Sequence, residues 1–128
     1  MSLEEAELMR KRAEAFLRNA KRLIDEGEYD LAMFNIEQYC QLMLKYKLLV
    51  ERGSYPRTHS LRALLRVIGE EKPEVLFLIE DEKYLHYIAR IEEAYIISRY
   101  LPYTYDAKEV SDVYNFVIEV FRKVVEKV

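Results

Sequence analysis

The chain has 128 residues, of which 51% are hydrophobic and 34% charged, and its formal net charge is −3. This length suits one domain with its own hydrophobic core, and the slightly negative charge excludes a protein that attracts nucleic acid over its whole surface. No segment approaches the roughly 18 uncharged apolar residues of a membrane span, and the N-terminus has no apolar stretch of signal-peptide type. We therefore expect a single cytoplasmic domain over residues 1–128 with no contact to a membrane.

The cysteine and histidine content limits the chemistry that the chain can perform. One cysteine, Cys40, and two histidines, His59 and His86, are too few for a disulfide framework or a zinc motif. Cys40 lies in an apolar helical pattern, which predicts a buried thiol, and a structural role is expected for His86. The three glycines are far apart, so no phosphate-binding loop is present, and no serine or cysteine nucleophile has an identifiable base. The sequence predicts no metal, no cofactor and none of the common catalytic centres.

The N-terminal part predicts two long helices separated by Gly27. The first covers about Ser2–Asp25, where Ser2 and Glu5 have the spacing of a capping box, and the second covers about Tyr29–Glu51. The apolar band of the second helix is wide enough to indicate contact on two sides, with helices of the bundle or with another chain. The band consists of Ala32, Ile36, Tyr39, Cys40, Met43, Leu44 and Leu48, widened by Leu31, Leu42 and Leu49.

The C-terminal part predicts three further helices. One starts after Thr58, which can accept a hydrogen bond as its N-cap, and ends near Gly69. A helical turn at Pro73–Ile79 precedes a helix over about Asp81–Arg99, and the last helix begins at Asp106. Its many β-branched residues would suit a strand, but the three-four apolar spacing over about 20 residues favours a helix. Because short connections favour antiparallel neighbours, the predicted fold is all-α, an antiparallel up-and-down bundle of four to five helices.

The first candidate site is the start of the third helix, in the segment "YPRTHSLRALL". Arg57, His59 and Arg62 stand here beside backbone amides that have no partner within the helix, and together they can bind an anion such as phosphate. Two alternatives stay open, because His59 can instead only pack at the helix start, or it can take part in catalysis.

The second candidate site is the end of the fourth helix, in the segment "EEAYIISRYLPYTYD". Four tyrosines surround Arg99 in the sequence, a combination that can stack a base and hold its phosphate: Tyr95, Tyr100, Tyr103 and Tyr105. The alternative is that the tyrosines are amphipathic core residues and that Arg99 pairs with a carboxylate.

A third feature is a group of basic residues on the first helix, in which Lys11, Arg18 and Arg22 fall roughly on one face. Interspersed glutamates favour a solvated face, and a weak patch for nucleic acid or a partner protein is the alternative.

Three segments in this order resemble the HEPN domain family: "YDLAMFNIEQYCQLMLKYKLLVERG", "YPRTHSLRALL" and "AYIISRYLPYTYDAKEV". The resemblance covers nearly the whole chain and implies an antiparallel helical bundle that commonly dimerises. It also implies a frequent partner, a small nucleotidyltransferase encoded nearby in a two-component or toxin–antitoxin pair. Some members of the family are metal-independent ribonucleases, and others bind nucleotides or partner proteins.

The ribonucleases of this family use an arginine followed a few residues later by a histidine, late in the bundle. Arg99 matches the arginine, but the following "YLPYTYD" contains no histidine. Arg52 and His59 have the required spacing, yet they span the connection between the second and third helices. The resemblance therefore implies a member without nuclease activity, in which His59 matches the histidine that this branch carries before a serine-leucine helix start.

The leading hypothesis is a non-catalytic, homodimeric HEPN-type protein that binds a nucleotide, a nucleotidyltransferase partner or both. One alternative is a ribonuclease with a divergent site at Arg52, His59 or Arg99, acting on RNA, and another is a purely structural homodimer. The candidate ligand-binding residues are Lys45, Arg57, His59, Arg62, Tyr95, Arg99, Tyr100 and Tyr103.

Overall fold

The computed structural model describes residues 3–128, and all regular secondary structure in this range is helical, which confirms the all-α prediction. The predicted cap at Ser2 lies outside the described residues. The elements are α1 (Leu3–Asp25), α2 (Tyr29–Arg52), α3 (Leu61–Gly69), the 3₁₀ turn η1 (Pro73–Val75), α4 (Phe77–Glu80), α5 (Glu82–Tyr100), α6 (Ala107–Phe116), the π-helical turn η2 (Val117–Phe121) and α7 (Arg122–Lys127). Within the described part of the chain, no helix is both long and apolar enough to cross a membrane.

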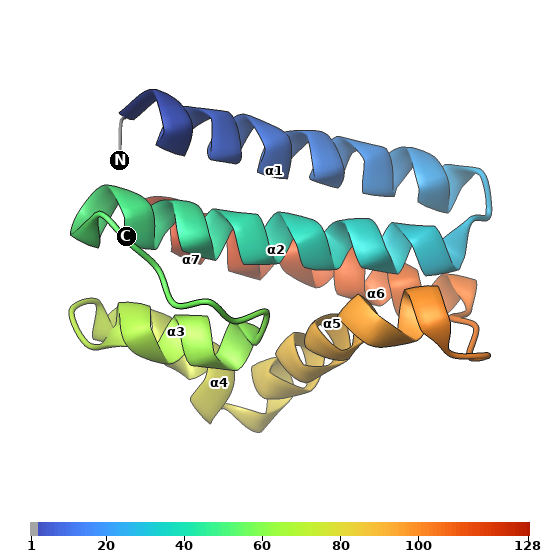
Figure 1. The fold of residues 1–128 in the computed structure, drawn as a ribbon. Coiled ribbons are helices and arrows are strands. Elements are labelled where there is room, and N and C mark those ends of the chain that lie inside the picture. The colour runs from blue at the N-terminus through green and yellow to red at the C-terminus, as the bar shows by residue number, and fades with distance from the viewer. Residues whose placement is uncertain (1–2) are drawn as a thin grey trace.

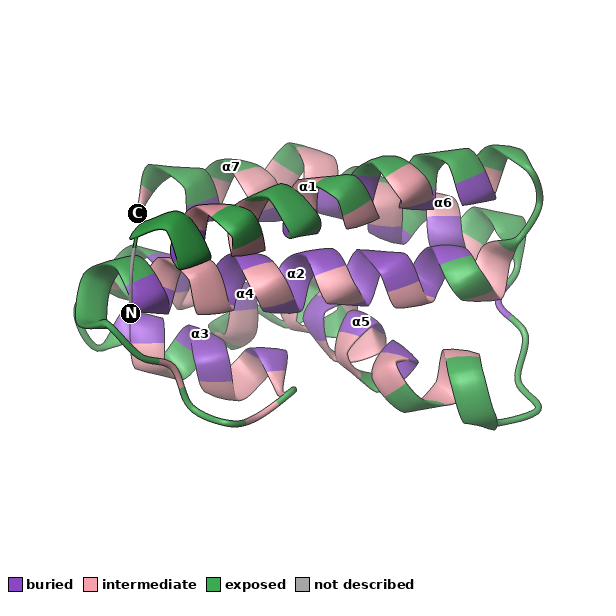
Figure 2. Ribbon diagram, turned by 45° about the horizontal axis from the view of Figure 1, so that its top comes forward, coloured by how far each residue is buried: buried purple, intermediate pink, exposed green. Residues whose placement is uncertain are grey.

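Helix α2 lies at the centre of the molecule and contacts α1, α3, α5, α6 and α7. Figure 1 shows α1 and α2 as an antiparallel pair, with the C-terminal helices behind α2 and with α3 and α5 below it. In Figure 2, buried residues recur along α2, from Ala32 to Leu49. Neighbours from the same chain thus explain most of the wide apolar band, although Leu31 in that band is exposed.

The connection between α2 and α3 doubles back along α2, so α3 runs in the same direction as α2 (Figure 1). Gly53 ends α2 with a φ of 80°, a left-handed conformation that glycine adopts at little cost. At its end, α3 meets the end of α2 again, since Arg52 donates a hydrogen bond to the Val67 carbonyl at 3.1 Å. The helix directions therefore differ from a strict up-and-down alternation.

Short polar side chains begin three of the helices. Asp81 caps α5, and Asp106, where the last helix was predicted to begin, caps α6 by accepting from the Glu109 amide at 2.8 Å. The prediction that Thr58 caps α3 is wrong, because Ser60 is the cap and accepts from the Ala63 amide. Thr58 instead accepts from the Ser60 amide, so it orders the extended residues that lead into the helix.

The predicted C-terminal helix forms as α6, η2 and α7 without interruption (Figure 1). The π-helical turn η2 ends at Phe121, whose ring packs edge-on against the buried Tyr39 ring of α2 at a centroid distance of 6.2 Å. Arg122 follows at once and bonds to Glu14 of α1 at 3.1 Å. The C-terminal helices thereby join α2 by apolar packing and α1 by an ion pair.

A close approach at Gly69 gives a prediction about the packing of α3 against the turn that follows it. A Cβ atom on Gly69 would lie 2.7 Å from Leu76 Cγ, so we expect Gly69→Ala to destabilise the protein by about 1–3 kcal/mol. Helix propensity alone predicts the opposite sign, about 1 kcal/mol of stabilisation. Urea unfolding measures the change, and in a Leu76→Ala background Gly69→Ala should become neutral or stabilising. A stabilising effect in the wild-type background would contradict the packing described here.

Candidate functional site

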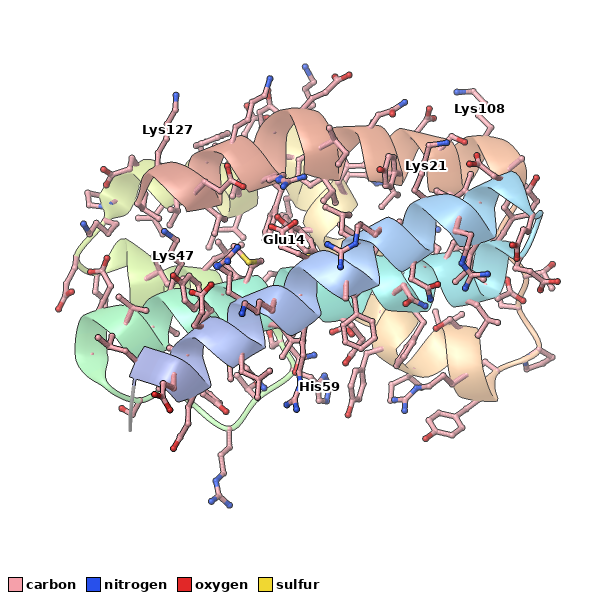
Figure 3. The ribbon with its side chains drawn as sticks, turned by 90° about the horizontal axis from the view of Figure 1, so that it is seen from above. Glu14, Lys21, Lys47, His59, Lys108 and Lys127 are labelled. Carbon is pink, nitrogen blue, oxygen red and sulfur yellow. The ribbon has the colours of Figure 1, made fainter. Side chains whose placement is uncertain are left out.

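His59 lies at the end of the connection between α2 and α3, where it stacks on Tyr95 of α5. The two rings are nearly parallel, with an interplanar angle of 7° and centroids 4.3 Å apart. The imidazole is exposed, and Figure 3 shows it on the opposite side of α1 from Glu14. His59, from the first candidate site, therefore contacts Tyr95, which belongs to the second candidate site.

Arg99 reaches the same tyrosine from the next turn of α5. Its guanidinium carbon lies 4.5 Å from the centroid of the Tyr95 ring, 4.9 Å from that of Phe34 and 4.7 Å from that of Tyr100. Nε and Nη2 of Arg99 donate to the Tyr95 carbonyl at 2.9 and 2.7 Å. Among residues 3–128, Arg99 forms no salt bridge. We call Phe34, His59, Tyr95, Arg99 and Tyr100 the Tyr95 cluster.

A row of polar side chains on α2 adjoins the Tyr95 cluster, and we call Glu37, Gln38, Gln41 and Lys45 the α2 polar ladder. The fully buried Glu37 carboxylate accepts from Gln38 Nε2 at 2.7 Å and from Gln41 Nε2 at 2.6 Å. Gln41 in turn accepts from Lys45 Nζ at 2.9 Å. Glu37, Gln41 and Lys45 stand four residues apart. Residues at this spacing share one face of a helix, so their side chains form one line of hydrogen bonds along α2.

Burial and neighbouring charges shift the pKa values of Glu37 and Lys45 in opposite directions. Burial raises the pKa of Glu37 to about 7, although the bonds from Gln38 and Gln41 and the charges of Lys45 and Arg99 act to lower it. Burial also lowers the pKa of Lys45, against the attraction of Glu37. The electrostatic interaction between Glu37 and Arg99 links the ladder to the Tyr95 cluster.

Glu92 of α5 occupies the start of α3. Its Oε1 accepts from Ser60 Oγ and from the Arg62 amide, each at 3.0 Å, and its Oε2 accepts from Arg62 Nη2 at 2.8 Å. Burial raises the pKa of Glu92, but the hydrogen bonds from Arg62 and Ser60 outweigh burial and hold it below its usual range. The protein's own carboxylate thus fills the position where the sequence predicted an external anion between Arg62 and the helix amides.

The structure brings together only part of the predicted site. His59, Tyr95, Arg99 and Tyr100 form one cluster, and Lys45 lies on the adjoining ladder, where its amine is also 5.3 Å from the Tyr55 ring centroid. Arg62 is bound to Glu92, as described above. Arg57 is exposed in the connection before α3.

Two further candidates lie away from the Tyr95 cluster. The Tyr103 hydroxyl donates to Glu109 at 3.3 Å and lines a depression of about 460 Å³ between α5 and α6, together with His86. Arg52 bonds to the Val67 carbonyl and approaches Glu70 and Glu71 at the end of α3, whereas His59 precedes its start. The structure therefore does not bring Arg52 and His59 together.

Sequence reasoning missed three polar or aromatic neighbours of the site on α2, namely Phe34, Glu37 and Gln41. A signal existed for Glu37 and Gln41, since they stand four residues apart inside a wide apolar band, where buried polar groups need partners. Glu92 gave no such signal, because its partners lie 30 or more residues away in the sequence. No group of three or more histidine, cysteine or acidic side chains in residues 3–128 could hold a metal ion.

The raised pKa of Glu37 predicts a pH-dependent stability. Between pH 4.5 and about 7 the folded protein binds more protons than the unfolded chain, so the unfolding free energy falls as pH rises through this range. Glu37→Gln removes this ionisation, so the variant should gain about 3 kcal/mol over the wild type above neutral pH and nothing in acid. Urea unfolding of both proteins at several pH values measures the difference. A difference that is the same at all pH values would contradict the raised pKa.

Comparison with protein families gives one match, in which the HEPN domain covers residues 6–128. Searches of curated proteins and of solved structures each returned no match. The match takes in all the helices that build the Tyr95 cluster and the α2 polar ladder. The chain belongs to the HEPN domain family.

Proposed function

We propose that this HEPN-domain protein binds a nucleotide at the Tyr95 cluster and does not cleave it. The observation that carries the proposal is the meeting of His59 and Arg99 on the ring of Tyr95. A guanidinium that can contact phosphate and an imidazole that can stack on a base thereby come from different elements to one aromatic surface.

Arg99 is the residue expected to hold the phosphate. A guanidinium has five N–H donors in a fixed plane, and the Tyr95 carbonyl engages only two of its nitrogens. Three aromatic rings confine the side chain, so little conformational entropy remains to be lost on binding. The absence of a salt bridge to Arg99 within residues 3–128 leaves its charge available to an anion.

His59 and Tyr100 are the groups expected to contact the base. Tyr100 has 67% of its surface exposed, and the His59 imidazole is exposed as well. Stacking on such rings accepts any base, since every base has a π face. Lys45, in the α2 polar ladder, adds a second positive charge. Its amine is partly buried, and partial burial strengthens its electrostatic attraction for a phosphate chain.

The absence of a histidine after Arg99 supports a role without cleavage. Glu37 has a pKa near 7, which would suit a general base, but its side chain is fully buried and bonded to Gln38 and Gln41. A group without exposed surface cannot abstract a proton from a substrate in this conformation.

Exposed apolar residues beside the cluster support a protein partner. Leu31, Ile96 and Leu101 are 48%, 41% and 51% exposed, and they lie near the positions of Phe34 on α2 and Arg99 on α5. We expect a second copy of the chain or a nucleotidyltransferase to cover this surface. The nucleotidyltransferase, in a two-component or toxin–antitoxin pair, is the partner that the family resemblance implies.

Calorimetric titration with ATP tests the proposed site. We expect Arg99→Ala to weaken binding about tenfold or more, because a charge-assisted hydrogen bond contributes about 1.5–3 kcal/mol. His59→Ala should also weaken binding, and both substituted residues are exposed, so neither change should unfold the protein. Arg66→Ala, an exposed arginine of α3 outside the cluster, is the matched control and should bind like the wild type.

The nucleotide proposal fails if ATP and other nucleotides give no saturable heat with the wild type. It fails equally if Arg66→Ala weakens binding as much as Arg99→Ala does, because the effect would then reflect net charge and not position.

A ribonuclease remains the alternative, and the shared contact of His59 and Arg99 with Tyr95 is the observation that favours it. We expect no cleavage when the wild type is incubated with RNA of mixed sequence in the presence of a chelator. Cleavage that is lost in both His59→Ala and Arg99→Ala, and retained in Arg66→Ala, would overturn the non-catalytic role.

A further inference from the structure

We propose a second binding site, for a dianionic phosphate group, in the depression between α1 and α7. The depression has a volume of about 480 Å³, and Glu14 at its wall lies on the opposite side of α1 from His59 (Figure 3). Its lining residues are Arg10, Lys11, Glu14, Arg18, Arg122 and Glu126. This site is separate from the Tyr95 cluster and does not depend on the function proposed for it.

Cationic side chains predominate in the lining. Four cationic and two anionic side chains line the depression, and one of the cations, Arg10, is also bonded to Glu7. Arg122 is bonded to Glu14 at 3.1 Å and to Glu126 at 3.0 Å. Lys11 and Arg18, two helical turns apart on α1, form no hydrogen bond or salt bridge within residues 3–128, so their donors are available to a ligand.

A buried hydroxyl on α2 lacks a hydrogen-bond partner among the described residues. Tyr39 is fully buried, and its Oη has no hydrogen-bond partner among the described residues. Its electrostatic interactions reach Glu14, Arg122 and Glu126, which are three of the six lining residues. A buried donor without a partner destabilises the folded protein, so a ligand that gives this hydroxyl a partner gains affinity.

The unpartnered hydroxyl gives the site a way to accept an anion. A phosphate that binds Arg122 competes with the Glu14 carboxylate for the guanidinium. We expect Tyr39 Oη, which interacts electrostatically with Glu14, to donate to the displaced carboxylate. Phosphate binding then gives Tyr39 Oη the hydrogen-bond partner that it lacks in the free protein.

The π-helical turn η2 places Arg122 at this site. It ends at Phe121, which packs against Tyr39, and Arg122 follows directly. A π-helical turn shifts the face of all later residues relative to a regular α-helix, and such turns occur frequently at functional sites. Phe121 faces α2, and Arg122, about 100° further round the helix, reaches Glu14 of α1.

The volume of the depression indicates the size of the ligand. An inorganic phosphate ion fills only a small part of 480 Å³, so the space also admits the organic group of a phosphate monoester. Inorganic phosphate and a monoester share the dianionic phosphate group proposed for this site, and binding experiments distinguish them.

Titration calorimetry with inorganic phosphate and with AMP tests the site in a His59→Ala/Arg99→Ala background, in which the Tyr95 cluster is disabled. We expect saturable binding that Lys11→Ala/Arg18→Ala weakens about tenfold or more at constant ionic strength. The matched control is Lys21→Ala/Lys123→Ala, which removes the same charge from exposed residues of α1 and α7 outside the depression and should not change the affinity. Tighter binding of AMP than of phosphate identifies a monoester, and equal binding identifies the free ion; either result supports the site.

The proposal is overturned if neither anion binds saturably, or if the control pair loses as much affinity as the pair in the depression. Tyr39→Phe gives a second measurement, because it removes only the hydroxyl. We expect it to raise the melting temperature in phosphate-free buffer and to weaken phosphate binding. Unchanged affinity in this variant would contradict the role assigned to Tyr39.

Discussion

The Glu92 carboxylate ties the start of α3 to the middle of α5, and the position of His59 in the Tyr95 cluster depends on this tie. Its oxygens accept from the Ser60 hydroxyl, the Arg62 amide and the Arg62 guanidinium. These bonds hold the last residues of a connection that crosses back along α2, and His59 directly precedes them. Without these hydrogen bonds, the connection would not hold the exposed His59 ring in its stacked position on Tyr95.

Helix α2 carries both the core and the polar ladder, and this combination has a cost. A fully buried carboxylate at Glu37 is destabilising when ionised, and two glutamine amides compensate for only part of that loss. Stability alone would favour an apolar residue at this position. Glu37 interacts electrostatically with Lys45 and Arg99, the two cations assigned to the proposed nucleotide site. The buried carboxylate of Glu37 thus lowers the unfolding free energy of the protein, and it places a negative charge within electrostatic range of Lys45 and Arg99.

Sequence periodicity predicted the helices well, because apolar spacing and the glycines and prolines between helices are local features. Tyr29, Gly69 and Asp106 were placed correctly or within one residue of an observed boundary or cap. The choice of Thr58 over Ser60 as the cap of α3 failed, since both residues can cap and only their backbone conformation decides. The site was harder to predict. The contact of His59 with Tyr95 depends on the return path of a connection, and the capture of Arg62 by Glu92 depends on two residues that are distant in sequence.

Nucleotide binding by His59 and Arg99 on the ring of Tyr95 is tested most directly by NMR spectra of the protein recorded during a titration with ATP. The signals of the His59 ring, the Arg99 guanidinium and the Tyr95 ring should shift together and saturate at one ligand concentration. Signals of the Arg66 guanidinium on α3 should not follow them. Saturable binding that leaves the His59, Tyr95 and Arg99 signals unchanged, or no binding at all, would contradict the proposed site.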